Sequence, residues 1–171
     1  MRGLALAGLG AALIAGSALA AEPLTGPVAA LGFMVGDWQS DGEASGAGAG
    51  GVSAIHADLG GRVLVRRDHV LTKAGGAFDI YMVVYPEGPA LRAEFVDTEG
   101  HTIHYVAMVR PGPAVTFDSP GSAQAPGFRL TYAAAGADRL HIRFEIAPPG
   151  GAYKTYSEGD VVRQPAGPQS R

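Results

Sequence analysis

The sequence predicts an all-β fold: an antiparallel up-and-down meander of about ten strands, closed into a barrel and preceded by a short N-terminal helix. Ten segments with alternating or continuous apolar character follow one another from residue 37 onwards. Many of the 26 glycines and 12 prolines fall between these segments, which is typical of short elements joined by tight turns. The only tryptophan, Trp38, opens the series.

The first 20 residues have the pattern of a secretory signal peptide. Met1-Arg2 gives a positive start, an apolar stretch follows from Gly3 to Gly16, and Ala18-Leu19-Ala20 supplies a small-x-small cleavage pattern. The apolar stretch is shorter than the ~20 residues of a membrane span. We therefore expect a periplasmic or secreted protein with no stable membrane insertion after cleavage.

The expected domain division is a signal peptide over 1–20, one β-barrel domain over 21–164, and a disordered tail over 165–171. The chain has no cysteine, which excludes disulfides, thiol catalysis and a cysteine-linked lipid anchor. The net charge is −3 and no long basic run occurs, so nucleic acid is not an expected partner. The sequence leaves the oligomeric state open.

The elements are expected in a simple order. One or two helical turns over Pro27–Phe33 begin with proline in the first turn. A flexible hairpin tip is expected over Gly46–Gly51. The expected strands are 37–45, 52–59, 62–71, 78–86, 90–97, 101–110, 113–118, 127–134, 139–147 and 152–163.

Closure of the meander follows from the short connections. Parallel strands need crossovers of about a dozen or more residues, and the chain has no helical segment of that length. An open ten-strand meander leaves two edges exposed, and closure removes them. A barrel is therefore favoured over a sandwich, and it encloses a core or a small cavity.

The most specific local prediction is a hairpin between residues 91 and 109. Asp97-Thr98-Glu99-Gly100 reads as a type I turn followed by a glycine bulge. This turn pairs Glu94 with His104 on one face of the hairpin. The other expected pairs are Asp97 with His101, Phe95 with Ile103, Ala93 with Tyr105, Val96 with Thr102 and Arg92 with Val106.

Several motifs together resemble a known family. The short helix and Gly36-x-Trp38 are similar to the calycins, in which this tryptophan lies at the closed end of a lipocalin-like barrel. The fuller pattern resembles an uncharacterised family of secreted bacterial lipocalin-like domains near the nitrobindins. That pattern comprises Leu31–Trp38, Asp58-Leu59-Gly60-Gly61-Arg62, Asp97-x-x-Gly100-His101 and Phe144–Gly150.

The nitrobindin resemblance implies haem held by a histidine close to the C-terminus, and the sequence departs from this pattern. Its last histidine is His141, and Tyr156 stands in the segment that should carry the ligand. Tyrosine can ligate haem iron, so Tyr156 leaves haem as a minor alternative. No cofactor is predicted.

The polar residues on the strands allow two interpretations. In the first, apolar side chains fill the interior and polar ones face solvent. In the second, part of the polar set lines a pocket for a small apolar or amphipathic ligand. The candidate ligand-binding residues are Trp38, Arg66, Tyr81, Glu94, His104, Tyr105 and Arg129.

Two other classes of function stay open. An enzyme of calycin type would use Glu94, His104 and Tyr105 on a small carbonyl or phenolic substrate. A ligand-free structural domain would have a filled core. No Gly-x-Ser-x-Gly motif is present, and no catalytic residue is predicted.

Metal binding is not predicted either. His101 and His104 lie three apart on a strand and so face opposite sides of it. A site that joins Glu94 and His104 to His56 or His69 is geometrically open, but the pattern does not select it.

Overall fold

A computed structural model describes residues 22–46 and 48–165 of the chain. The expected signal peptide, and all but the first residue of the expected tail, lie outside the described residues. One 3-10 helix, η1 (Gly26–Met34), precedes ten strands. The strands are β1 (Gly36–Gly46), β2 (Gly48–Asp58), β3 (Val63–Thr72), β4 (Ala77–Glu87), β5 (Ala90–Asp97), β6 (Thr102–Arg110), β7 (Ala114–Ser119), β8 (Gly127–Ala134), β9 (Arg139–Ala147) and β10 (Lys154–Arg163).

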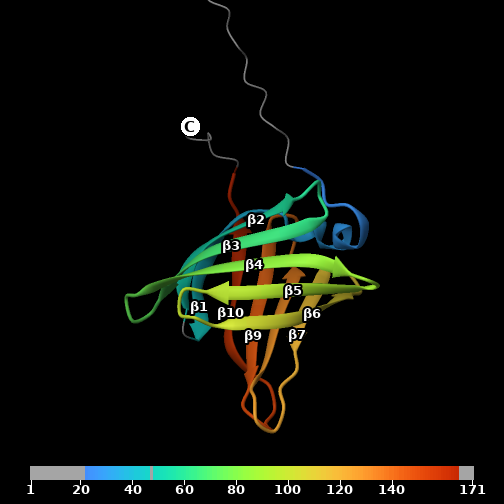
Figure 1. Cartoon of the computed structure of the whole chain (residues 1–171). Helices are drawn as coiled ribbons and strands as arrows, with labels where there is room; N and C mark the ends of the chain where they lie inside the picture. Colours follow the sequence, from blue (N-terminus) through green and yellow to red (C-terminus); the bar gives the residue numbers. More distant parts are fainter. Residues whose placement is uncertain (1–21, 47, 166–171) are drawn as a thin grey trace, which may run out of the picture.

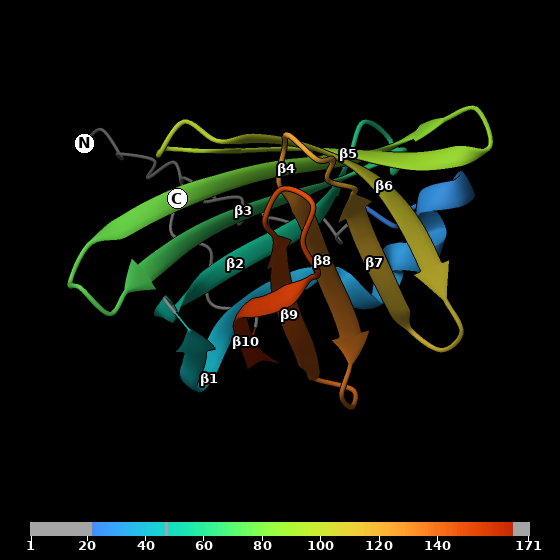
Figure 2. The ribbon, with the colours of Figure 1, turned by 90° about the horizontal axis from the view of Figure 1, so that it is seen from below.

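The ten strands form a closed antiparallel barrel. Each strand pairs with its neighbour in sequence, and β1 also pairs with β10, so that the sheet has no free edge. Figure 1 shows β2 to β5 crossing in front of β7 to β10, and Figure 2 shows the strands running around a common interior. The predicted meander, its closure and the preceding helix are confirmed.

The hairpin of β5 and β6 has the predicted register. Glu94 lies opposite His104 and Ala93 opposite Tyr105. Gly100 has a φ of 91°, and its amide donates to the Asp97 carbonyl at 3.2 Å, as a glycine bulge requires. The turn chemistry of four residues therefore determines the pairing of two strands.

The expected hairpin tip over Gly46–Gly51 is wrong in its extent. Strand β2 begins at Gly48, and Gly50 and Gly51 pair with Leu71 and Val70 of β3. A Cβ atom at Gly51 would overlap the carbonyl oxygen of His69. Glycine is present here because the two backbones approach closely, and the ladder compensates for its flexibility.

One end of the barrel is closed by η1 and the tryptophan. Val28, Leu31 and Met34 of the helix are buried in the core, and Trp38 Nε1 donates to the Met34 carbonyl at 2.8 Å. The guanidinium of Arg163 lies 4.3 Å from the centre of the indole ring. The sequence interpretation of Trp38 as a plug stacked against Arg163 is confirmed.

Gly36 permits this stacking. Its φ of 148° is unfavourable for other residues, and a Cβ atom there would overlap Arg163 Nη1. Arg163 Nη1 donates to the Val35 carbonyl at 2.7 Å, and Nε donates to Asp138 at 3.1 Å. The first and last strands are therefore joined at the closed end by one arginine.

Candidate functional site

Side chains that point into the barrel become more exposed from the closed end towards the other end. Leu64, Val84 and Tyr132 are 0% exposed, whereas Arg66 is 7% and Asp68 9% exposed. Farther along lie Val70, Phe78, Phe128 and Phe144, which are only partly buried although they pack against the core. We call this interior the lumen and its more exposed end the mouth.

The most unusual feature of the lumen is a buried ion pair. Residues 64, 66 and 68 of β3 alternate onto the inner face, so Arg66 and Asp68 lie side by side on one strand. Arg66 Nε donates to Asp68 Oδ1 at 2.9 Å, and Nη2 donates to Oδ2 in a two-pronged pair. Ser53 Oγ of β2 donates to the same Oδ1 at 2.6 Å.

Two tyrosine hydroxyls are buried in the same lumen. Tyr105 of β6 is 2% exposed and Tyr132 of β8 is 0% exposed. Among the described residues, neither hydroxyl oxygen has a hydrogen-bond partner. Each such group carries a desolvation cost of about 1–3 kcal/mol, so a buried hydroxyl without a partner needs an explanation.

Tyr105 and Tyr132 both lie near the Arg66 guanidinium. The Arg66 guanidinium lies 5.5 Å from the centre of the Tyr132 ring, and its Nη1 contacts Met82 Sδ at 3.9 Å. Burial raises the pKa of both Tyr105 and Tyr132, so their hydroxyls stay protonated. Burial alone would lower the pKa of Arg66, but the Asp68 carboxylate, together with Tyr132 and Tyr105, outweighs burial and raises that pKa.

The mouth is aromatic. Phe128 and Phe144 stack with parallel rings 6.2 Å apart, and Tyr156 meets Phe144 edge-on at 6.0 Å. Tyr156 is 50% exposed and lies at the irregularity where β10 shifts its register against β9. The mouth therefore offers an apolar, partly wet surface in front of the buried ion pair.

The loops β7–β8 and β9–β10 meet beside this mouth. Gly150 N donates to the Ser122 carbonyl at 2.9 Å, which ties the two loops together (Figure 1, bottom). Tyr153 lies over the Arg129 guanidinium at 3.9 Å. These contacts fix one side of the rim.

The structure brings only part of the predicted binding set together. Arg66 and Tyr105 face the lumen, and Trp38 forms its floor at the closed end. The other four lie on the outer face of the barrel, because the residues next to them on each strand point inward. They are Tyr81, Glu94, His104 and Arg129.

The outer four have partners on that face. Tyr81 receives the Arg67 guanidinium over its ring at 5.4 Å. Arg129 Nε donates to Asp118 at 2.9 Å. His104 pairs with Glu94, as the hairpin register predicted, and the His104 side chain is 75% exposed.

An open hollow of about 390 Å³ adjoins the Glu94–His104 pair. Tyr85, Arg92, Tyr105 and Asp118 also line it, and the Tyr85 hydroxyl donates to Glu94 Oε1 at 3.2 Å. The suggested enzyme site would add Tyr105 to this pair. The Tyr105 hydroxyl is fully buried, so it does not reach the pair through open space.

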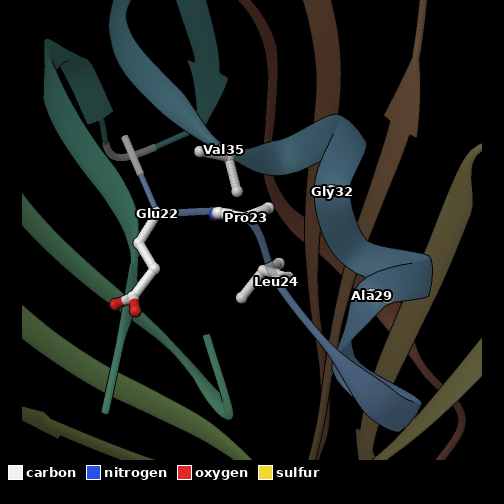
Figure 3. A pocket seen from close by; sticks show the side chains of 6 residues that line it. All are labelled: Glu22, Pro23, Leu24, Ala29, Gly32 and Val35. Atoms are coloured by element: carbon white, nitrogen blue, oxygen red, sulfur yellow. The ribbon is translucent and has the colours of Figure 1, made fainter. Parts of the chain in front are cut away.

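A second hollow, of about 310 Å³, lies outside the barrel beside the helix. Figure 3 shows Pro23, Leu24 and Val35 around the space between the N-terminal segment and η1, with the Glu22 carboxylate directed away from them. The atoms that line this hollow are mostly apolar, and Glu22 at its edge is its one charged residue. It offers no convergent polar set for recognising a ligand.

Among the described residues, Asp97, Glu99 and His101 form a group close enough to hold a metal ion. The Asp97 carboxylate already accepts bonds from the amides of Glu99 and His101, at 3.0 and 2.9 Å. Its other oxygen lies 2.9 Å from His101 Nδ1. These bonds are those of the hairpin turn, which accounts for the cluster.

The residues at Tyr156 do not fit haem. A phenolate ligand to iron is stabilised by hydrogen bonds or cations at its oxygen. Among the described residues no hydrogen bond or cation–π contact involves Tyr156, and its ring packs against Phe144. The surroundings of Tyr156 therefore favour a packing role at the mouth over a role as an iron ligand.

Three residues near Arg66 were not among the candidate binding residues predicted from the sequence: Ser53, Asp68 and Tyr132. The signal for Asp68 was present, because Leu64, Arg66, Asp68 and Val70 alternate on one face. Tyr132 shares its face with Phe128 and Leu130, which hid its hydroxyl among apolar neighbours. Ser53 carries no comparable signal.

The fold defines a closed ten-strand antiparallel barrel with one short helix, which is compatible with a lipocalin-like fold. Comparison with known proteins finds no matching family model and no matching curated protein. Within the described residues, no helix is long and apolar enough to cross a membrane.

Proposed function

We propose that the protein is an exported lipocalin-like carrier that binds a small amphipathic molecule in its lumen. The apolar part of the ligand lies against Phe128 and Phe144 at the mouth, and its polar end reaches Arg66, Tyr105 and Tyr132. One observation carries this proposal: among the described residues, two buried hydroxyls without hydrogen-bond partners stand beside the buried Arg66–Asp68 pair in a largely apolar interior. Binding sites combine these elements in this way.

Export rests on the signal-peptide pattern of residues 1–20. The similarity of the Gly36-x-Trp38 motif to calycins supports the same class, because the structure places Trp38 at the closed end of a barrel. On this proposal the outer-face residues do not contact the ligand.

The direct test is native mass spectrometry of the protein purified from the compartment to which it is exported, together with its absorption spectrum. We expect a co-purified small molecule that is lost in an Arg66→Met/Asp68→Leu double variant, which keeps the core apolar. A protein that is empty in both forms, and that no amphipathic probe stabilises, would indicate a structural domain. A Soret band would contradict the proposal by showing haem.

A further inference from the structure

The hydrogen-bonding capacity left free in the lumen defines the chemistry of the ligand. The guanidinium group has five N–H groups, and three of those of Arg66 are engaged, with Asp68 and Met82. Among the described residues the other two have no acceptor. The hydroxyls of Tyr105 and Tyr132 add two further donors. The free groups are thus mainly donors, and they require an acceptor oxygen.

The charge of the lumen is already balanced. Asp68 accepts two bonds from Arg66 and one from Ser53, so the positive charge faces a carboxylate that is itself bound. The two side chains are only 8% and 7% exposed. An anionic ligand would leave one negative charge uncompensated in a poorly solvated interior, and burying such a charge is strongly unfavourable.

From these two observations we infer that the lumen selects a ligand whose polar end is an uncharged carbonyl oxygen, as in an ester, amide or ketone, over one that ends in a carboxylate. The inference rests on the proposed function and narrows it. A carbonyl oxygen accepts two hydrogen bonds, so it can pair with two of the four free donors without bringing a charge into the lumen. An apolar tail then extends to Phe128 and Phe144 at the mouth.

The experiment compares probes that share one tail: methyl decanoate, decanamide, sodium decanoate and decane. Isothermal titration calorimetry on the protein without its N-terminal 20 residues, at a pH where decanoate is ionised, gives the four affinities. We expect the ester and the amide to bind at least about tenfold more tightly than decanoate or decane, the equivalent of one net hydrogen bond. If no probe binds, the proposed lumen site fails. If decanoate binds as tightly as the ester, only the carbonyl inference fails.

Two tyrosine variants test the donors without breaking the ion pair. Tyr132→Phe removes a hydroxyl that has no partner, so we expect the melting temperature of the empty protein to rise by roughly 3 °C. The same change should weaken methyl decanoate about fivefold. A lower melting temperature would show that the hydroxyl is already satisfied and would overturn the inference.

Tyr85→Phe is the matched control. Its hydroxyl lies on the outer face and donates to Glu94. We expect this variant to lose a little stability and to keep its affinity for the ester. An equal loss of affinity in both tyrosine variants would exclude the lumen hydroxyls as specific contacts.

Asp68→Asn tests the charge balance. It keeps a side chain of the same shape but removes the carboxylate that neutralises Arg66. In protein that stays folded, the preference between the ester and decanoate should move towards decanoate by about tenfold or more. An unchanged preference in a folded variant would contradict the inference.

Discussion

The closed end and the middle of the lumen both place an arginine beside a buried aromatic ring, but the Arg163 side chain is 32% exposed whereas that of Arg66 is 8% exposed. The two regions also differ in whether their buried polar atoms are paired. At the closed end, Trp38 donates to a carbonyl and Arg163 to a carbonyl and a carboxylate. In the lumen, no partner within residues 22–46 and 48–165 pairs with two of the Arg66 N–H groups or with the hydroxyls of Tyr105 and Tyr132.

This difference in the pairing of polar atoms indicates that the closed end serves stability and the lumen serves binding. At the plug the buried indole N–H is paired and the partly exposed Arg163 can reach water, so the cost of unpaired buried polar groups is avoided. Unpaired donors lower the stability of the empty protein, and such a cost persists where it contributes to function. Variants of the two regions should therefore respond differently: the plug loses stability alone, and the lumen exchanges stability for affinity.

The largest expected effect is at the plug. Trp38→Ala removes a side chain that is 1% exposed, and we expect a loss of about 3–5 kcal/mol in the free energy of unfolding, because a large cavity remains. Urea unfolding followed by circular dichroism measures it. A variant with the wild-type midpoint would contradict the role of the indole in closing the barrel.

The next largest effect is at the lumen pair. Asp68→Asn leaves Arg66 charged and uncompensated, which should destabilise the protein by about 3 kcal/mol. Urea unfolding of Asp79→Asn is the control, since Asp79 pairs with His69 on the outer face, where the two side chains are 64% and 54% exposed. That exposed pair should contribute less than about 1 kcal/mol. Equal losses in the two variants would show that Asp68 is not in a buried pair.

A smaller effect that depends on pH is expected at the seam of β9 and β10. His141 lies 2.7 Å from Asp160 and 2.8 Å from Glu158, with Arg139 and Arg143 also in contact with these carboxylates. The bond to Asp160, more than any other interaction, raises the pKa of His141 above its ordinary value of 6.5.

A raised pKa in the folded state sets the direction of the pH effect. The stabilisation is fully present below pH 6.5 and is lost as the pH rises through the folded-state pKa. His141→Gln should therefore cost stability near about pH 5.5 and progressively less above neutrality. Because more than a third of the side chain is exposed, the effect should stay below about 1 kcal/mol. A cost that grows with pH would reverse the assignment.

Much of the fold could be predicted because it depends on local patterns. Alternation along each segment gave the strands, and the turn at Asp97–Gly100 gave the pairing of Glu94 with His104. The position of Trp38 before a meander indicated the closed end. The prediction of a loop at Gly50 and Gly51 was wrong, because glycine is as suitable for close contact between two strands as it is for a loop.

The site was harder to predict because its residues come from separate strands and meet only across the barrel. Alternation places Arg66 and Asp68 on one face but does not say that this face is the inner one. Tyr105 and Tyr132 come from β6 and β8, and only the curvature of the barrel brings both near Arg66. Polarity alone also suggested Glu94 and His104, which the same alternation places outside.

The smallest expected effect distinguishes the inner face from the outer face within one strand. His104 and Ile103 are neighbours on β6, and His104 is exposed whereas Ile103 is 6% exposed. His104→Ala should change the free energy of unfolding by less than about 0.5 kcal/mol, whereas Ile103→Ala should cost about 2–5 kcal/mol. Urea unfolding measures both. If His104→Ala also keeps the affinity for methyl decanoate, binding is located in the lumen. A loss of binding in that variant would place the ligand in the outer hollow beside Glu94.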